Sequence, residues 1–113
     1  LKVIFWSYSL EIMKRTIEIM VWPNLRKDLE FSQTLDCLSV KFQDYCSTLR
    51  IESQNGENYI LFAEFQNSDQ LHHMLQSKEF KILAGAVMAL CQKSEIRLDG
   101  EPFKQEIAQL SNI

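Results

Sequence analysis

Two adjacent histidines and one tyrosine are the side chains in this sequence best suited to acid–base chemistry. His72 and His73 could serve as a general base, because histidine titrates near neutral pH. Tyr59 could donate a hydrogen bond to an oxygen of an aromatic substrate. Neighbouring residues on a helix point about 100° apart, so at most one histidine can face a given pocket. The candidate catalytic residues are therefore His73, His72 and Tyr59. The alternative is that the histidines lie at the surface and the tyrosine covers a strand end.

The elements that must position these residues begin with an alternating stretch at 15–22. Ile17, Ile19 and Val21 fall on one face of this predicted strand, which Pro23 ends. A helix is predicted over 25–43, with Asn24 as its N-cap, because apolar residues recur there at helical spacing. Strand and helix together begin an α+β pattern.

A hairpin follows, with strands predicted at 46–53 and 58–65 around Asn55-Gly56. Its register stays open, because a two-residue loop places Arg50 on the face of Leu61, and a bulge places it on the face of Phe62.

The second half of the chain repeats the alternation of helix and strand. Asn67 and Ser77 can each cap a helix, a short strand is predicted at 95–99, and a short amphipathic helix is predicted after Gly100. The order is that of the ferredoxin-like βαββαβ arrangement, an antiparallel sheet with helices on one face. We predict an N-terminal apolar extension at 1–13, either an extra strand or sequence added upstream. The domain itself spans 14–100, and a C-terminal helical tail spans 101–113.

The two faces of the predicted sheet differ in what they carry. The helix-facing side is expected to form plain core or to line a pocket for an apolar ligand. Its members are Ile17, Ile19, Val21, Leu61, Ala63, Phe65, Phe80 and Leu83. The other side mixes apolar residues with charges, which suits a subunit interface better than open water. There we predict a structural polar network of Glu18, Arg50, Glu64 and Arg97, because buried charges are tolerated only when paired.

Composition excludes several classes of function. The chain has 113 residues, enough for one domain, and a net charge of −3 without a basic run, so we expect no nucleic-acid partner. The apolar stretch at 1–13 is too short and too polar to span a membrane. The cysteines Cys37, Cys46 and Cys91 lack metal-ligand spacing, which predicts free thiols in a reducing, cytoplasmic setting. No phosphate loop or nucleophile elbow is present in the sequence.

The stretch YILFAEFQNSDQLHHMLQSKEFKILAGAVMALC resembles the antibiotic-biosynthesis monooxygenase family, and the similarity covers roughly 14–100. Glu64-Phe65 matches the family's Glu and usual Trp, and Leu75, Ser77 and Phe80 match its Leu-x-Ser step and the following Phe. The resemblance implies a homodimeric α/β barrel that oxidises a small aromatic or quinol-type substrate with molecular oxygen. It also implies no metal or flavin, so no cofactor is expected.

The sequence departs from the family at the positions where histidines are frequent. Met74 and Glu79 stand there instead. The positions that serve haem degradation in one branch hold Ile17, Phe65 and Ala84 or Gly85, which argues against that reaction. Two functions stay open: a monooxygenase-like enzyme, or a non-catalytic dimeric module for small-molecule binding or assembly. An open cavity with converging polar groups would favour the enzyme, and a filled apolar interior would favour the module.

Overall fold

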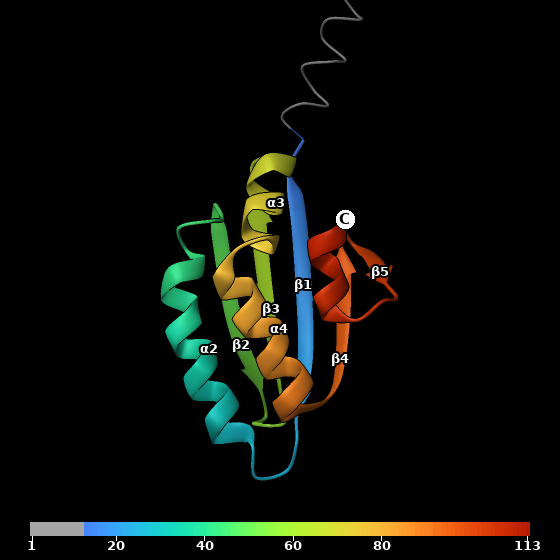
Figure 1. The fold of residues 1–113 in the computed structure, drawn as a ribbon. Coiled ribbons are helices and arrows are strands. Elements are labelled where there is room, and N and C mark those ends of the chain that lie inside the picture. The colour runs from blue at the N-terminus through green and yellow to red at the C-terminus, as the bar shows by residue number, and fades with distance from the viewer. Residues whose placement is uncertain (1–12) are drawn as a thin grey trace, which may run out of the picture.

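A five-stranded antiparallel sheet, in the order β2-β3-β1-β4-β5, carries all the helices on one face (Figure 1). The computed structural model describes residues 13–113, so the predicted extension lies outside the described residues except for Met13. The strands are β1 (Arg15–Pro23), β2 (Thr48–Gln54), β3 (Asn58–Phe65), β4 (Cys91–Leu98) and β5 (Glu101–Phe103). The helices are α2 (Asp28–Phe42), α3 (Ser68–Leu75), α4 (Lys78–Leu90) and the 3₁₀-helix η1 (Ile107–Asn112). The predicted α+β, ferredoxin-like fold is confirmed.

Strand β1 lies at the centre of the sheet and separates its two faces. Ile17, Ile19 and Val21 are buried beneath the helices, whereas Glu18 and Met20, on the opposite side, are only half-buried. This follows from the period of two along a strand. We call the helix-covered side the inner face. The outer face includes Thr16, Glu18, Met20, Trp22, Thr48, Arg50, Glu52, Ile60, Phe62, Glu64, Lys93, Glu95, Arg97 and Pro102.

The β2–β3 hairpin resolves the register that the sequence leaves open. Gln54 pairs with Asn58, so three residues form the turn, and Asn55 and Gly56 in it have φ angles of 54° and 71°. Asparagine and glycine tolerate this left-handed conformation better than other residues. The longer turn places Arg50 opposite Phe62, on the outer face.

The helices begin where a local cap or turn permits. Helix α3 begins at Asn67, whose Oδ1 accepts from the Gln70 amide at 2.9 Å. Helix α4 begins at Ser77, whose Oγ accepts from the Phe80 amide at 3.1 Å. The predicted Asn24 cap is wrong. Lys27 holds the N-cap position of α2 without a side-chain cap, because Arg26, at φ 72°, closes a turn first.

The C-terminal segment is integrated into the domain. Residues 101–103 form β5, a strand the sequence did not predict, and the helical part of the tail is a 3₁₀-helix. Ile107 and Leu110 of η1 are 2% and 0% exposed, and η1 packs against α4 and α3, so this helix closes the core beside them (Figure 1).

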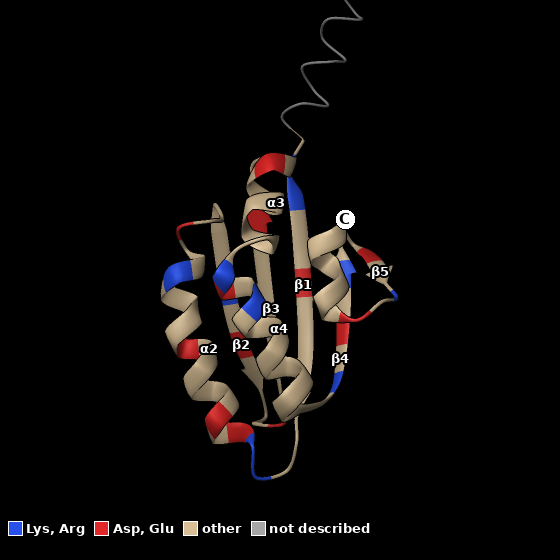
Figure 2. Ribbon diagram, viewed as in Figure 1, with Lys and Arg blue, Asp and Glu red and all other residues tan. Residues whose placement is uncertain are grey.

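Lys and Arg residues are interspersed with Asp and Glu residues along the strands and helices that the structure describes (Figure 2). Among residues 13–113, no helix has the length and apolar character needed to cross a membrane.

Candidate functional site

The space between the inner face and helices α2 and α4, which we call the seam, is where the sequence predicts either plain core or an apolar pocket. Its remaining void is about 10 Å³. A cavity needs roughly 10–15 Å³ to hold one water molecule. The lining consists of Ile19, Val21, Phe31, Leu35, Tyr59, Leu61 and Leu83. The seam is therefore filled by the protein's own side chains.

The predicted pocket-lining residues lie together, in the core around this seam. Ile17, Ile19, Val21, Leu61, Ala63, Phe65, Phe80 and Leu83 are all at most 3% exposed. They pack against one another and against α2 rather than around an open space.

Tyr59 supplies the polar group at the seam. Its Oη donates to Asp28 Oδ1 at 3.0 Å, which ties the first turn of α2 to β3. Its ring lies 5.7 Å from that of Phe31, centroid to centroid. Burial and the hydrogen bond to Asp28 raise the pKa of Tyr59 above its ordinary value, so the hydroxyl stays protonated near neutral pH. Asp28 is a partner that the sequence did not single out.

The two candidate histidines lie far from Tyr59. Tyr59 is near the start of β3, and His72 and His73 are on α3, which follows the other end of that strand (Figure 1). About 20 Å of strand separates Tyr59 from Phe65, at the α3 end. His72 is half-buried, and exposed His73 contacts the Tyr45 ring edge-on, with 5.2 Å between ring centroids. The three candidate catalytic residues therefore do not share one site.

A second polar contact joins Tyr45 to Glu79 on the inner side of the fold. Glu79 is 8% exposed, and Tyr45 Oη donates to its Oε1 at 2.6 Å. This hydrogen bond, followed by burial and the carboxylate's negative charge, raises the pKa of Tyr45. Glu79 occupies a position where the family that the sequence resembles often carries a histidine. The burial of Glu79 could have been predicted from the sequence, because Glu79 lies four residues before Leu83 and therefore on the buried stripe of α4.

The four residues of the predicted polar network form no ion pair with one another within the described part of the chain, and two of them have other partners. Glu64 pairs with Lys14 at 3.5 Å, and the Arg50 guanidinium lies 4.7 Å from the centroid of the Phe62 ring. Glu18 and Arg97 are opposite each other across β1 and β4, yet no ion pair joins them among the described residues. Glu18 and Arg50 instead line a depression of about 200 Å³ on the outer face, together with Glu52, Ile60 and Phe62.

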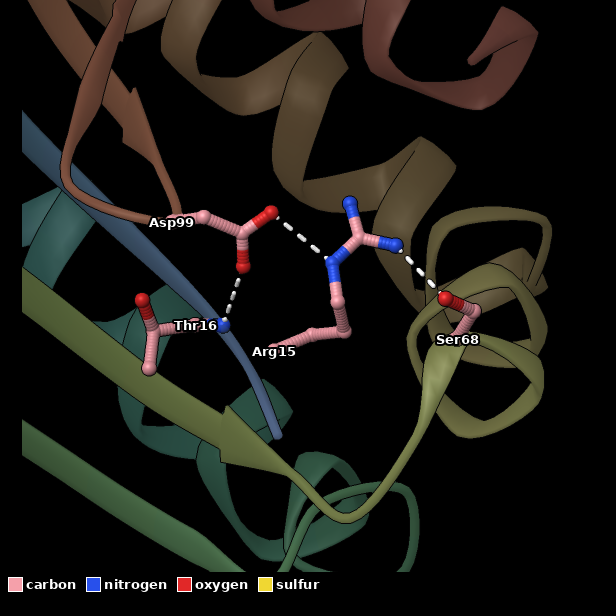
Figure 3. A network of polar contacts seen from close by, with 4 residues as sticks. All are labelled: Arg15, Thr16, Ser68 and Asp99. Atoms are coloured by element: carbon pink, nitrogen blue, oxygen red, sulfur yellow. Dashed lines mark hydrogen bonds and ion pairs between the residues drawn. The ribbon is translucent and has the colours of Figure 1, made fainter. Parts of the chain in front are cut away.

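A polar clamp holds the end of the sheet near α3 (Figure 3). Arg15 Nε donates to Asp99 Oδ2 at 2.8 Å, and its Nη1 donates to Ser68 Oγ at 2.7 Å. The other carboxylate oxygen of Asp99 accepts from the Thr16 amide at 3.0 Å. The clamp joins β1, α3 and the β4–β5 turn, and its polar groups form hydrogen bonds with one another. It therefore has a structural role.

The cysteines give no indication of a redox or metal site. Cys37, Cys46 and Cys91 are free, and residues 13–113 contain no cluster of three or more metal-ligating side chains. Burial raises the pKa of Cys46, and raises that of Cys91 to about 11, so both thiols are weakly nucleophilic at neutral pH.

Comparison with known proteins identifies the fold. No protein-family model and no curated protein matches the sequence. A conserved protein from Methanosarcina mazei Go1 superposes with a TM-score of 0.71 at 16% identity, covering 83% of this chain and 98% of that one. A structure described as an antibiotic biosynthesis monooxygenase gives a TM-score of 0.68 at 12% identity, covering 76% of this chain and 95% of that one.

A third similar structure is SnoaB, a cofactor-independent oxygenase from Streptomyces nogalater. It gives a TM-score of 0.60 at 21% identity, covering 75% of this chain and 89% of that one. At these identities the likeness establishes the fold and not the reaction. The chain thus has the fold of monooxygenase-like proteins, as the sequence resemblance implies.

Proposed function

We propose that this chain works as a homodimeric assembly module built on a monooxygenase-like fold. The observation that carries this proposal is the filled seam. A void of about 10 Å³ cannot admit an aromatic ring without repacking the core around it. The separation of Tyr59 from His72 and His73 supports the same conclusion, since converging polar groups would be expected at a catalytic centre.

The outer face supports the homodimer. Met20, Ile60 and Phe62 lie there half-buried, beside Glu18 on the central strand. Among residues 13–113, helices cover one face of this antiparallel sheet (Figure 1), and the opposite face carries both apolar and charged residues. A second copy would cover such a surface and bring its charges together.

The test is the mass of the purified chain by light scattering across micromolar concentrations. The expected result is a dimer. A strict monomer throughout this range would contradict the proposal.

A monooxygenase-like enzyme acting on a small aromatic or quinol is the second candidate. The observation that favours it is the Tyr59–Asp28 pair, which combines a protonated hydroxyl and a carboxylate at the edge of the apolar seam. A substrate hydroxyl placed there could hydrogen-bond to Tyr59 and lose its proton to Asp28. Asp28 is exposed, so the pair lies at the solvent-facing rim of the seam. His72 and His73 would not take part at this end of the sheet.

The second candidate is tested by oxygen uptake with a panel of quinols. An enzyme should exceed a denatured-protein control, and Tyr59→Phe and Asp28→Asn should each lower the rate at least about tenfold. Uptake equal to the control for every quinol would rule this function out.

A further inference from the structure

The charges on the outer face are unequally satisfied within one chain. Lys14 pairs with Glu64 at 3.5 Å and Lys93 pairs with Glu95 at 3.2 Å. Four other charged residues of this face have no ion pair among the described residues: Glu18, Glu52, Arg50 and Arg97. Two carboxylates and two guanidiniums therefore remain, and their charges balance.

These groups lie in rows across the sheet. Arg50 is opposite Phe62, Phe62 is opposite Glu18, and Glu18 is opposite Arg97. Glu18 is half-buried at the centre of its row and borders the outer-face depression. A partly desolvated carboxylate without a cation is unfavourable, and no described residue of the same chain forms an ion pair with Glu18, so a positive group of a second subunit would stabilise it.

A second copy of this chain fits the pattern better than a partner of one charge sign. A strongly basic partner would leave the arginines uncompensated, and a strongly acidic one would leave the glutamates uncompensated. A two-fold interface makes every contact twice, so a face with equal numbers of free carboxylates and guanidiniums can satisfy itself.

Arg97 is the better donor of the two arginines. The Arg50 guanidinium already lies over the Phe62 ring, at 4.7 Å from its centroid. Arg97 is exposed and has neither an ion pair nor an aromatic contact among the described residues. Its planar guanidinium can bind a carboxylate through two parallel hydrogen bonds.

We propose that Glu18 of each subunit pairs with Arg97 of the other, at the outer-face depression, and that the two reciprocal pairs fix how the sheets are aligned. This inference rests on the proposed homodimer. It adds the contacts that would make the chain select its own copy and reject like-charged surfaces.

The test uses two charge reversals, Glu18→Arg and Arg97→Glu, studied separately and mixed. Each variant alone sets like charges against each other twice. We expect its dimer dissociation constant to rise at least about 30-fold. Mixing the two variants matches every charge again across the interface, so we expect a mixed dimer that binds within about tenfold of the natural chain. Sedimentation measures both, and mass spectrometry distinguishes the mixed species.

Rescue upon mixing separates pairing between subunits from pairing within one. If Glu18 and Arg97 paired within a chain, mixing would not repair either variant, and that result would overturn the inference. Circular dichroism checks that each variant is folded. Glu18→Gln and Arg97→Gln replace a reversal that fails to fold, with a rise of about tenfold or more expected for each.

Arg50→Glu is the matched control, because Arg50 lies in the same row. The inference fails if Glu18→Arg is rescued by Arg50→Glu and not by Arg97→Glu. It also fails if the natural chain dimerises and neither Glu18→Arg nor Arg97→Glu changes its dissociation constant by more than about threefold. In both cases the homodimer itself stands. A natural chain that is monomeric refutes the proposed function, and this inference with it.

Discussion

The two faces of the sheet carry phenylalanines three residues apart on one strand, with different surroundings. Phe65, on the inner face of β3, is 0% exposed beneath the helices, whereas Phe62, on the outer face, is half-buried beside Arg50. Among the described residues, helices cover the inner face, and no helix covers the outer one. We therefore expect the inner face to supply stability within one chain, and the outer face to supply the association proposed above.

The largest expected effect comes from truncating these two phenylalanines. Phe65→Ala should lower the free energy of unfolding by about 3–5 kcal/mol, because it opens a cavity in the core. Phe62→Ala should lower it by about 1 kcal/mol or less within a subunit and should weaken the dimer instead. Chemical denaturation at two protein concentrations, with sedimentation, separates the two effects. If both variants lost the same free energy of unfolding within a subunit, the two faces would not differ in their contribution to subunit stability.

A smaller effect should come from the polar pair on the inner side, Tyr45 and Glu79. The pKa of Tyr45 is raised in the folded chain relative to its ordinary value of about 10. The folded state therefore holds this proton more tightly than the unfolded state. The resulting stability is fully present below about pH 10 and is lost as pH rises through the raised pKa.

Tyr45→Phe isolates this contribution. Denaturant midpoints measured between about pH 9 and pH 11 should fall more steeply for the natural chain than for the variant. The difference is informative because Tyr59 and Cys91 also have raised pKa values and titrate in both proteins. Parallel pH profiles for the two proteins would show that folding does not raise the pKa of Tyr45.

The smallest effect is expected at the clamp of Figure 3, which involves neither face directly. Asp99→Asn removes the charge that binds Arg15 and still tolerates the backbone φ of 53° at this position. The Asp99 side chain is 40% exposed, so solvent screening should hold the loss to less than about 1 kcal/mol. Asp36→Asn, at an exposed position on α2, is the matched control in thermal unfolding. A loss above about 2 kcal/mol relative to this control would mean that the clamp is a major source of stability.

Much of the fold follows from local patterns. Alternation in 15–22 and 58–65 identifies the central strand β1, its neighbour β3 and their apolar face. Asn67 and Ser77 mark the starts of α3 and α4. Strand β5 was missed because its three residues include Pro102 and carry no alternating pattern. The late start of α2 was missed because nothing in the sequence requires a left-handed backbone at Arg26.

Less of the candidate site could be read from the sequence. Tyr59 was singled out, but its partner Asp28 lies 31 residues away, and Tyr45 and Glu79 are separated by 34. No spacing rule connects such residues, because the path of the chain between them decides whether they meet. His72 and His73 were predicted to be catalytic from their residue type alone. Residue type does not specify which side chains meet in one site.

The sequence by itself determined the βαββαβ order of the main elements, the apolar stripes and the two-sided character of the sheet. These depend on the fixed periods of strand and helix, which act over a few residues. Tertiary structure alone decided that the seam is filled, that Tyr45 bonds to Glu79 and that Arg50 joins Phe62 on the outer face. Packing volume, hydrogen-bond pairing and strand register depend on groups brought together from distant parts of the chain, and each is settled only when all of them are in place.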